Sequence, residues 1–244
     1  MVRLAVVDVD GCLNAGEGKR LDLESLGRLA AINSEALAGR GPAITLCTGR
    51  QGPYVEVFMD AIGAFLPGLF ELGCGMYDPR DYSFLAHPAI SPQHLRALAE
   101  VRRLLTSAVI EPGLGQFSLG KEFMATVYPR GGISLDELAA LCRQRLANVQ
   151  EYRMLQSATC VDFVPVGVDK GAGVRWLAER TGIPLEDMGG VGDSNSDWTF
   201  LSLTGESAAP ANAQEELRRR ARYVSPYPYV AGTLDIIRHW RDGQ

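Results

Sequence analysis

The sequence is poor in the residues on which disulfide frameworks and histidine metal centres depend. Its 244 residues include five cysteines and three histidines. The cysteines are odd in number and widely spaced, and no two form a C-x-x-C pair, so neither a disulfide framework nor a zinc site is indicated. The histidines show no metal-ligand spacing. Reduced, partly buried thiols in a cytosolic protein fit this cysteine usage best.

Long apolar runs and an excess of positive charge are also lacking. No run approaches the length of a membrane span, and the first residues lead into a predicted strand without the basic, apolar and cleavage regions of a signal peptide. We therefore expect a cytoplasmic protein with no membrane partner. The formal net charge of −5 gives no electrostatic support for a nucleic-acid partner. An apolar content of 46% and a charged content of 22% are typical of a soluble globular protein.

The two ends of the chain show alternating strand and helix patterns. The apolar runs and their glycine and proline boundaries predict strands at 4–7, 43–47, 69–72, 188–191 and 206–209. Helices are expected at 22–38, 53–62, 171–181, 213–222 and 230–240, with another beginning at 198. This alternation is typical of a parallel sheet with right-handed crossovers. We predict an α/β protein with a Rossmann-like, doubly wound core, formed by residues 1–79 and 165–244.

The middle of the chain, residues 80–164, has a different pattern. Helices are expected at 92–106 and 134–147, the second with a capping box of Ser134 and Glu137. Strand-like runs follow each helix, at 108–118 and 122–129 and then at 149–155 and 159–164. Helix–hairpin–helix–hairpin predicts a small antiparallel sheet with helices on one face. We therefore expect an inserted α+β domain.

Two carboxylates follow the first predicted strand. Asp8 and Asp10 stand two residues apart, so alternation along a strand would place them on the same side. The carboxyl end of a parallel strand is where open α/β folds place their chemistry. Two carboxylates held together there are costly unless a cation lies between them or one is protonated. The pattern indicates a site, although a capping Asp and a turn Asp before Gly11 would look the same.

Three further polar segments follow strands or open helices. They are Thr48-Gly49-Arg50, Asp169-Lys170-Gly171 and Gly192-Asp193-Ser-Asn-Ser196-Asp197. Together with Asp8-Val-Asp10-Gly-Cys-Leu13, they match in order and context the four motifs of the haloacid dehalogenase-like superfamily of phosphohydrolases, which the chain resembles over nearly its whole length. The inserted domain resembles the type-two cap of that superfamily. Two departures are Ser196, where the superfamily has Asn, and Glu71-Leu72-Gly73, where relatives often have Glu-Asn-Gly.

The resemblance implies a Mg²⁺-dependent phosphatase that acts on a small phosphate ester through an aspartyl-phosphate. It assigns the nucleophile to Asp8 and the general acid and base to Asp10. The implied metal ligands are the Asp8 and Asp193 side chains and the Asp10 backbone carbonyl, supported by Asp197 and Ser196. Thr48, Gly49 and Lys170 would hold the phosphoryl oxygens. Similar capped relatives act on phosphoglycolate, sugar phosphates or mannosyl-phosphoglycerate.

Several alternatives remain open from the sequence. A phosphomutase would share the core motifs, and a non-catalytic binding or regulatory protein could use the same fold. Arg50 would lie at the surface or reach the substrate, and Asn212 would cap a helix or lie near the site. Lys121 and Glu122 are expected to open the second strand of the first predicted hairpin, as substrate contacts or as charges that protect an edge strand. No pattern indicates an oligomeric state.

Overall fold

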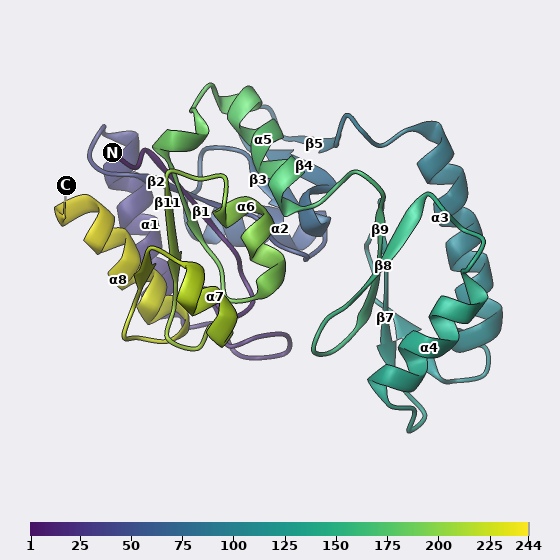
Figure 1. The fold of residues 1–244 in the computed structure, drawn as a ribbon. Helices are drawn as coiled ribbons and strands as arrows, with labels where there is room; N and C mark the ends of the chain where they lie inside the picture. The colour runs from purple at the N-terminus through teal and green to yellow at the C-terminus, as the bar shows by residue number, and fades with distance from the viewer. Residues whose placement is uncertain (244) are drawn as a thin grey trace. The chain divides into compact units, whose positions relative to one another are not determined.

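The computed structural model describes residues 1–243 and divides into two compact units. The first comprises Met1–Leu85 and the chain from Asp169 onward, and the second is the inserted segment Ala86–Val168 (Figure 1). Within the described residues, no helix combines the length and the apolar character needed to cross a membrane.

The first unit is built on a five-stranded parallel sheet with the strand order β12-β11-β10-β1-β2. Three neighbouring strands, β10 (Met188–Val191), β1 (Leu4–Val7) and β2 (Ala43–Leu46), are buried along their whole length. The other two strands are β11 (Glu206–Ala209) and β12 (Tyr223–Val224). Val7 pairs with both Leu46 and Val191, so these three strands end level with one another. The segments that follow them therefore emerge at one edge of the sheet.

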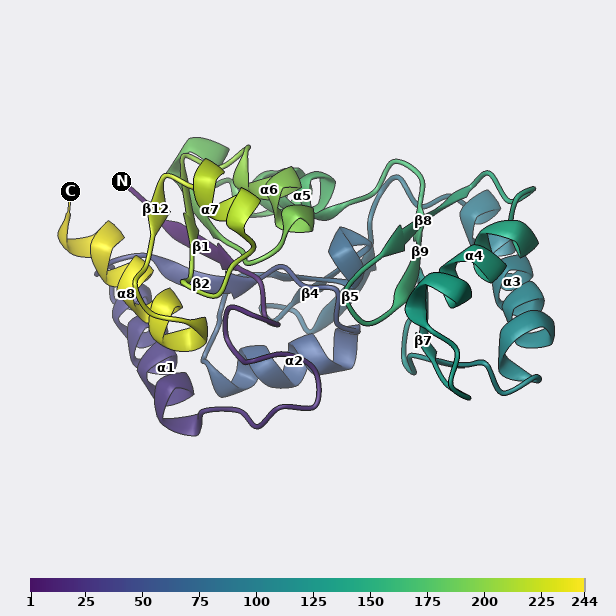
Figure 2. The same cartoon turned by 60° about the horizontal axis from the view of Figure 1, so that its bottom comes forward.

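Helices cover this sheet, which is why its strands read as continuous apolar runs rather than as alternating ones. Helices α1 (Leu23–Leu37) and α8 (Tyr229–Asp242) lie side by side (Figures 1 and 2). The others are α2 (Gly52–Ala61), α5 (Lys170–Thr181), α6 (Trp198–Leu201) and α7 (Glu215–Arg220). Asn33 of α1 is buried, and its side chain donates to the Ile62 carbonyl at 2.8 Å and accepts from the Ile44 amide at 2.7 Å.

The second unit packs α3 (Pro92–Leu105) and α4 (Leu135–Arg145) with a four-stranded antiparallel sheet of order β6-β7-β9-β8. Its strands are β6 (Gly115–Phe117), β7 (Ala125–Pro129), β8 (Tyr152–Gln156) and β9 (Val161–Pro165). Helix residues such as Val101 and Leu138 share its apolar core with the strand residues Val127 and Phe163. The predicted fold class, a parallel α/β core with an inserted α+β domain, is confirmed.

Three local predictions were wrong or incomplete. The segment 108–118 does not form one strand: the chain continues from α3 into a π-helix, Thr106–Ile110, and only β6 is extended. Val109 is fully buried, and a short apolar run fits a buried helix as well as a strand. Strand β3 (Gly68–Phe70) belongs to a second sheet with β4 (Gly75–Asp78) and β5 (Ser83–Ala86), and neither these two strands nor the two-residue β12 were predicted from the sequence.

Candidate active site

Asp8 and Asp10 lie just beyond the end of β1, but their carboxylates do not share one environment. The Asp8 amide donates to the Val191 carbonyl at 3.0 Å, which extends the strand pairing by one residue. The chain then turns, and Gly11 has a φ of +92°. Asp8 joins an acidic cluster, while Asp10 pairs with Arg50, so the two carboxylates have different partners.

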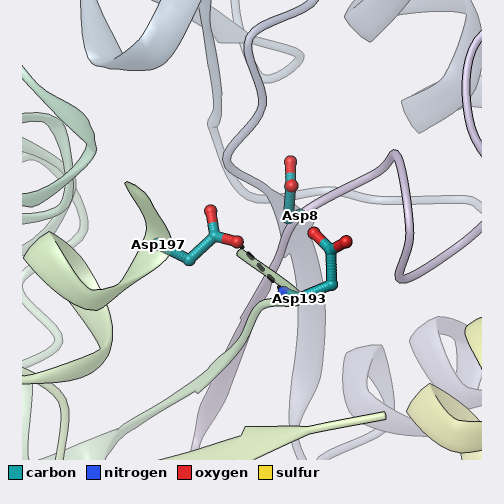
Figure 3. A group of neighbouring side chains, drawn as sticks. All are labelled: Asp8, Asp193 and Asp197. Atoms are coloured by element: carbon teal, nitrogen blue, oxygen red, sulfur yellow. Dashed lines mark hydrogen bonds between the residues drawn. The ribbon is translucent and has the colours of Figure 1, made fainter. Parts of the chain in front are cut away.

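The acidic cluster consists of Asp8, Asp193 and Asp197, which each offer an oxygen within 4.8 Å of the other two (Figure 3). Asp193 lies two residues beyond β10, the strand that pairs with β1, so the sheet register brings it to Asp8. Gly11 permits this approach, because a Cβ there would lie 2.2 Å from Asp193 Oδ2. The turn after β1 thus requires glycine both for its positive φ and for contact with Asp193.

The oxygens of Asp197 are already used by protein donors. Oδ2 accepts from the Asp193 amide at 3.0 Å (Figure 3), and also from the Ser194 amide at 2.9 Å and the Ser194 hydroxyl at 3.0 Å. Oδ1 accepts from Lys170 Nζ at 2.5 Å. Asp197 therefore fastens the loop that carries Asp193 and holds Lys170, and Asp8 and Asp193 are the cluster members better placed to face a cation.

Lys170 is the cation of the cluster. It is the first residue of α5, whose N-cap Asp169 accepts from the Ala172 amide, and its side chain is 4% exposed. Nζ lies 3.0 Å from Asp8 Oδ1 as well as against Asp197. An ammonium buried to this degree is tolerated because two carboxylates surround it.

The site holds more negative charge than its lysine balances. Burial raises the pKa of Asp8 to about 8, with Asp197 and Asp193 adding to the shift and Lys170 opposing it. Burial, reinforced by Asp197, raises the pKa of Asp193 to about 7. For Lys170, burial acts to lower the pKa, but the carboxylates of Asp197 and Asp8 outweigh it and the pKa is raised. The cluster therefore has a strong affinity for protons or for another cation.

The donors present suit a hard divalent cation. Carboxylate oxygens of Asp8 and Asp193 are the ligands that Mg²⁺ prefers. The Asp10 backbone carbonyl, which the family resemblance implies as a third ligand, accepts no hydrogen bond from residues 1–243. The residues expected to bind Mg²⁺ thus include three oxygen donors within two short segments, and none is a soft sulfur or nitrogen ligand.

Thr48, Gly49 and Arg50 follow β2 at the same edge of the sheet. Thr48 is buried, its amide donates to the Leu69 carbonyl, and its hydroxyl accepts from the Arg50 amide at 3.2 Å. Arg50 Nε and Nη2 donate to the two oxygens of Asp10 at 2.6 and 2.7 Å. This pairing was not predicted from the sequence. The only signal was that both residues come shortly after neighbouring strands.

Asn212 and Ser196 support nearby loops. Asn212 Nδ2 donates to the Gly11 carbonyl at 2.9 Å, and its Oδ1 accepts from the Tyr229 amide at 2.7 Å. It therefore links the Gly11 turn to the start of α8, combining the two roles considered for it. The Ser196 hydroxyl lies 2.7 Å from that of Ser194, which is itself bonded to Asp197.

Lys121 and Glu122 lie in the second unit, away from any strand. The structure places both in the turn before β7, which begins at Ala125, so the expected strand position was wrong. The Lys121 carbonyl accepts from Arg102 Nη2 at 2.5 Å, and Lys121 Nζ lies 3.8 Å from Met124 Sδ. Local contacts with α3 therefore fix the backbone at this turn.

Comparison with known proteins places these features in a family context. A family model described as haloacid dehalogenase-like hydrolase matches residues 132–237. A phosphoglycolate phosphatase of Staphylothermus marinus is 26% identical over 239 residues, which cover 97% of each chain. A phosphoglycolate phosphatase of Methanothrix thermoacetophila is 39% identical over 75 residues, which cover 31% of this chain and 34% of that protein.

Solved structures show the same fold at low identity. A Thermoplasma acidophilum protein superposes with a TM-score of 0.77 at 21% identity and covers 98% of each chain. The sucrose-phosphatase of Synechocystis, solved with sucrose and phosphate, superposes with a TM-score of 0.69 at 16% identity and also covers 98% of each chain. These similarities extend over both units of the chain.

Proposed function

From the premise that this chain is a phosphatase of the haloacid dehalogenase-like family, we propose that it hydrolyses small phosphate monoesters with Mg²⁺ through a phosphorylated Asp8. The observation that carries the proposal is the cluster of the buried Asp8 and Lys170 with the partly buried Asp193, where the pKa values of both carboxylates are raised. Keeping a nucleophile, a second carboxylate and a lysine together with little access to water is costly unless a cation and a phosphoryl group use them.

The proposed reaction has two steps. An Asp8 oxygen attacks phosphorus, the bond from phosphorus to the leaving oxygen breaks, and that oxygen takes a proton from the Asp10 carboxyl. Water then attacks the phosphoaspartate and gives its proton to the Asp10 carboxylate, which releases phosphate and restores Asp8. Lys170, Thr48 and the Gly49 amide would hold the phosphoryl oxygens, because preorganised donors stabilise the charge of the transition state.

Asp8, Asp193 and the Asp10 carbonyl would hold the Mg²⁺ ion. When bound, the ion would neutralise the repulsion between the Asp8 carboxylate and a phosphate dianion. Asp197 contributes indirectly, since it fixes the Asp193 and Ser194 amides and Lys170.

The substrate we propose is phosphoglycolate or a sugar phosphate. The named relatives that match over the full chain are phosphoglycolate phosphatases, which supports an ester of that size. We further propose that the inserted unit acts as a cap and selects the leaving group, because closure of a cap excludes water and suits small substrates. A phosphomutase would use the same Asp8 chemistry and differ in passing the phosphoryl group to a sugar hydroxyl.

The test is turnover of a panel of phosphate esters, including phosphoglycolate, hexose phosphates and p-nitrophenyl phosphate, with Mg²⁺ and with EDTA. We expect release of inorganic phosphate by the wild type with Mg²⁺ and none in EDTA. Asp8→Asn should abolish turnover while keeping the fold. Beryllium fluoride should trap the wild type as a mimic of the aspartyl-phosphate, but not this variant. Wild-type turnover by Asp8→Asn, or full activity in excess chelator, would refute the proposal. Conversion of one sugar phosphate into its isomer without phosphate release would identify a mutase.

A further inference from the structure

The side chain of Arg50 pairs with Asp10, the residue expected to serve as the general acid. Its guanidinium binds both oxygens of Asp10 in a bidentate pair, at 2.6 and 2.7 Å. The two side chains are 17% and 28% exposed, so solvent screens the pair weakly. Glu17 lies 3.7 Å from Arg50 Nη1, and the Tyr54 ring lies beneath the guanidinium at 4.8 Å. Arg50 is therefore held in place by three neighbours.

This geometry is at odds with the proposed role of Asp10. A general acid must direct one oxygen at the leaving group. In the Asp10–Arg50 pair, both oxygens accept hydrogen bonds from Arg50, and the fork geometry fixes the plane of the carboxylate. Asp10 can therefore face a leaving group only after the bidentate pair opens.

We propose that Arg50 exchanges the Asp10 carboxylate for a carboxylate on the substrate, so that binding of the correct leaving group releases the general acid. The proposal rests on the proposed phosphatase function and narrows its substrate class to phosphate esters of small hydroxy acids. A guanidinium binds any carboxylate through the same two parallel hydrogen bonds, so the exchange replaces one bidentate pair with another of the same kind.

The exchange explains how a substrate would be selected. An ester whose leaving group carries a carboxylate supplies Arg50 with a new partner when Asp10 turns away. An ester with a neutral leaving group supplies none, so the charge-assisted pair must be broken without compensation. Loss of such a pair corresponds to a decrease of about tenfold to a hundredfold in kcat/KM. Glu17 and Tyr54 keep the guanidinium at its position during the exchange.

The experiment compares two esters that differ in one group. Phosphoglycolate carries a carboxylate where 2-hydroxyethyl phosphate carries a neutral alcohol, and both leaving groups need a proton. We would measure kcat/KM for both with the wild type, Arg50→Gln and Arg50→Lys. Arg175→Gln provides the control, since Arg175 is an exposed arginine on α5.

In the wild type, phosphoglycolate should be favoured over 2-hydroxyethyl phosphate by at least about tenfold. Arg50→Gln should abolish that preference, because kcat/KM for phosphoglycolate falls when its carboxylate loses the guanidinium, whereas kcat/KM for the neutral ester rises because Asp10 no longer has a pair to break. Arg50→Lys, which keeps the charge but loses the fork, should fall between the two, and Arg175→Gln should match the wild type.

Three results would overturn the inference. Equal losses on both esters in Arg50→Gln would mean that Arg50 only holds Asp10 in position. Equal kcat/KM values of the wild type on 2-hydroxyethyl phosphate and phosphoglycolate would refute the preference for esters of hydroxy acids while leaving the phosphatase function intact. Failure of the wild type to hydrolyse any ester in the panel would refute the proposed function, and the inference with it.

Discussion

Asp197→Asn tests whether the acidic cluster is built as the structure indicates. The substitution keeps the shape of the side chain and removes its charge. The two carboxylate oxygens of Asp197 accept from four donors in total: Lys170 Nζ on one oxygen, and two amides and a hydroxyl on the other. An asparagine has one acceptor oxygen and one NH₂ group, so it cannot accept hydrogen bonds both from Lys170 and from the Asp193 and Ser194 donors.

The asparagine orientation of lower free energy is the one that turns its NH₂ group toward Lys170. That orientation keeps the three bonds to the Asp193 and Ser194 donors and loses the bond to Lys170. A hydrogen bond to a charged group contributes about 1.5–3 kcal/mol, and a buried ammonium facing another donor adds to the cost. We therefore expect a loss of about 3 kcal/mol in the free energy of unfolding. For a chain of this size, that corresponds to a decrease of about 6–12 °C in Tm.

The assay is thermal unfolding in EDTA, with Asp169→Asn as the matched control. Asp169 lies next to Lys170 and caps α5, where asparagine is about as good an N-cap as aspartate, so its Tm should change little. Asp197→Asn should also raise the Mg²⁺ concentration needed for half-maximal activity, because the cluster loses one of the negative charges that attract the cation. A Tm decrease no larger than that of Asp169→Asn would refute this account of the cluster.

Three further predictions concern the cation, the turn and the inserted unit. Because the pKa values of Asp8 and Asp193 are raised, the folded, metal-free protein holds protons that the unfolded chain releases above about pH 4, so its stability should fall as pH rises through 7 to 8. The increase in Tm caused by Mg²⁺ should therefore grow from about pH 5.5 to about pH 8.5, and an increase independent of pH would contradict this. Gly11→Ala should abolish Mg²⁺-dependent activity, whereas Gly16→Ala, which shares a positive φ but has no atom within 4 Å of its added Cβ, should only lower Tm, and equal activity of the two variants would show that the Asp193 contact is unimportant. Lys121→Ala and Glu122→Ala should each change the ratio of kcat/KM between the best natural ester and p-nitrophenyl phosphate by about tenfold, or about 1.4 kcal/mol, if the turn before β7 selects the leaving group, and an unchanged ratio would place selection elsewhere.

Local sequence patterns determined the architecture of this protein. The apolar runs at 4–7, 43–47 and 188–191 are short, continuous and bounded by glycine or polar residues, and they form three neighbouring strands at nearly the expected bounds. Their parallel arrangement follows from the helices between them. The polar segments that end these strands therefore had to meet at one edge of the sheet. Where an apolar run was ambiguous in period, as at Val109, the sequence alone did not distinguish a buried helix from a strand.

Tertiary structure decided how the side chains at that edge are paired. The bidentate Arg50–Asp10 pair joins residues 40 positions apart, and the bond from Asn212 to the Gly11 carbonyl joins residues 201 positions apart. Both depend on loops that leave the strands, where the chain has no periodicity from which to read the direction of a side chain. The pKa values of Asp8 and Asp193 depend likewise on burial, which the folded chain imposes and which no spacing of residues encodes.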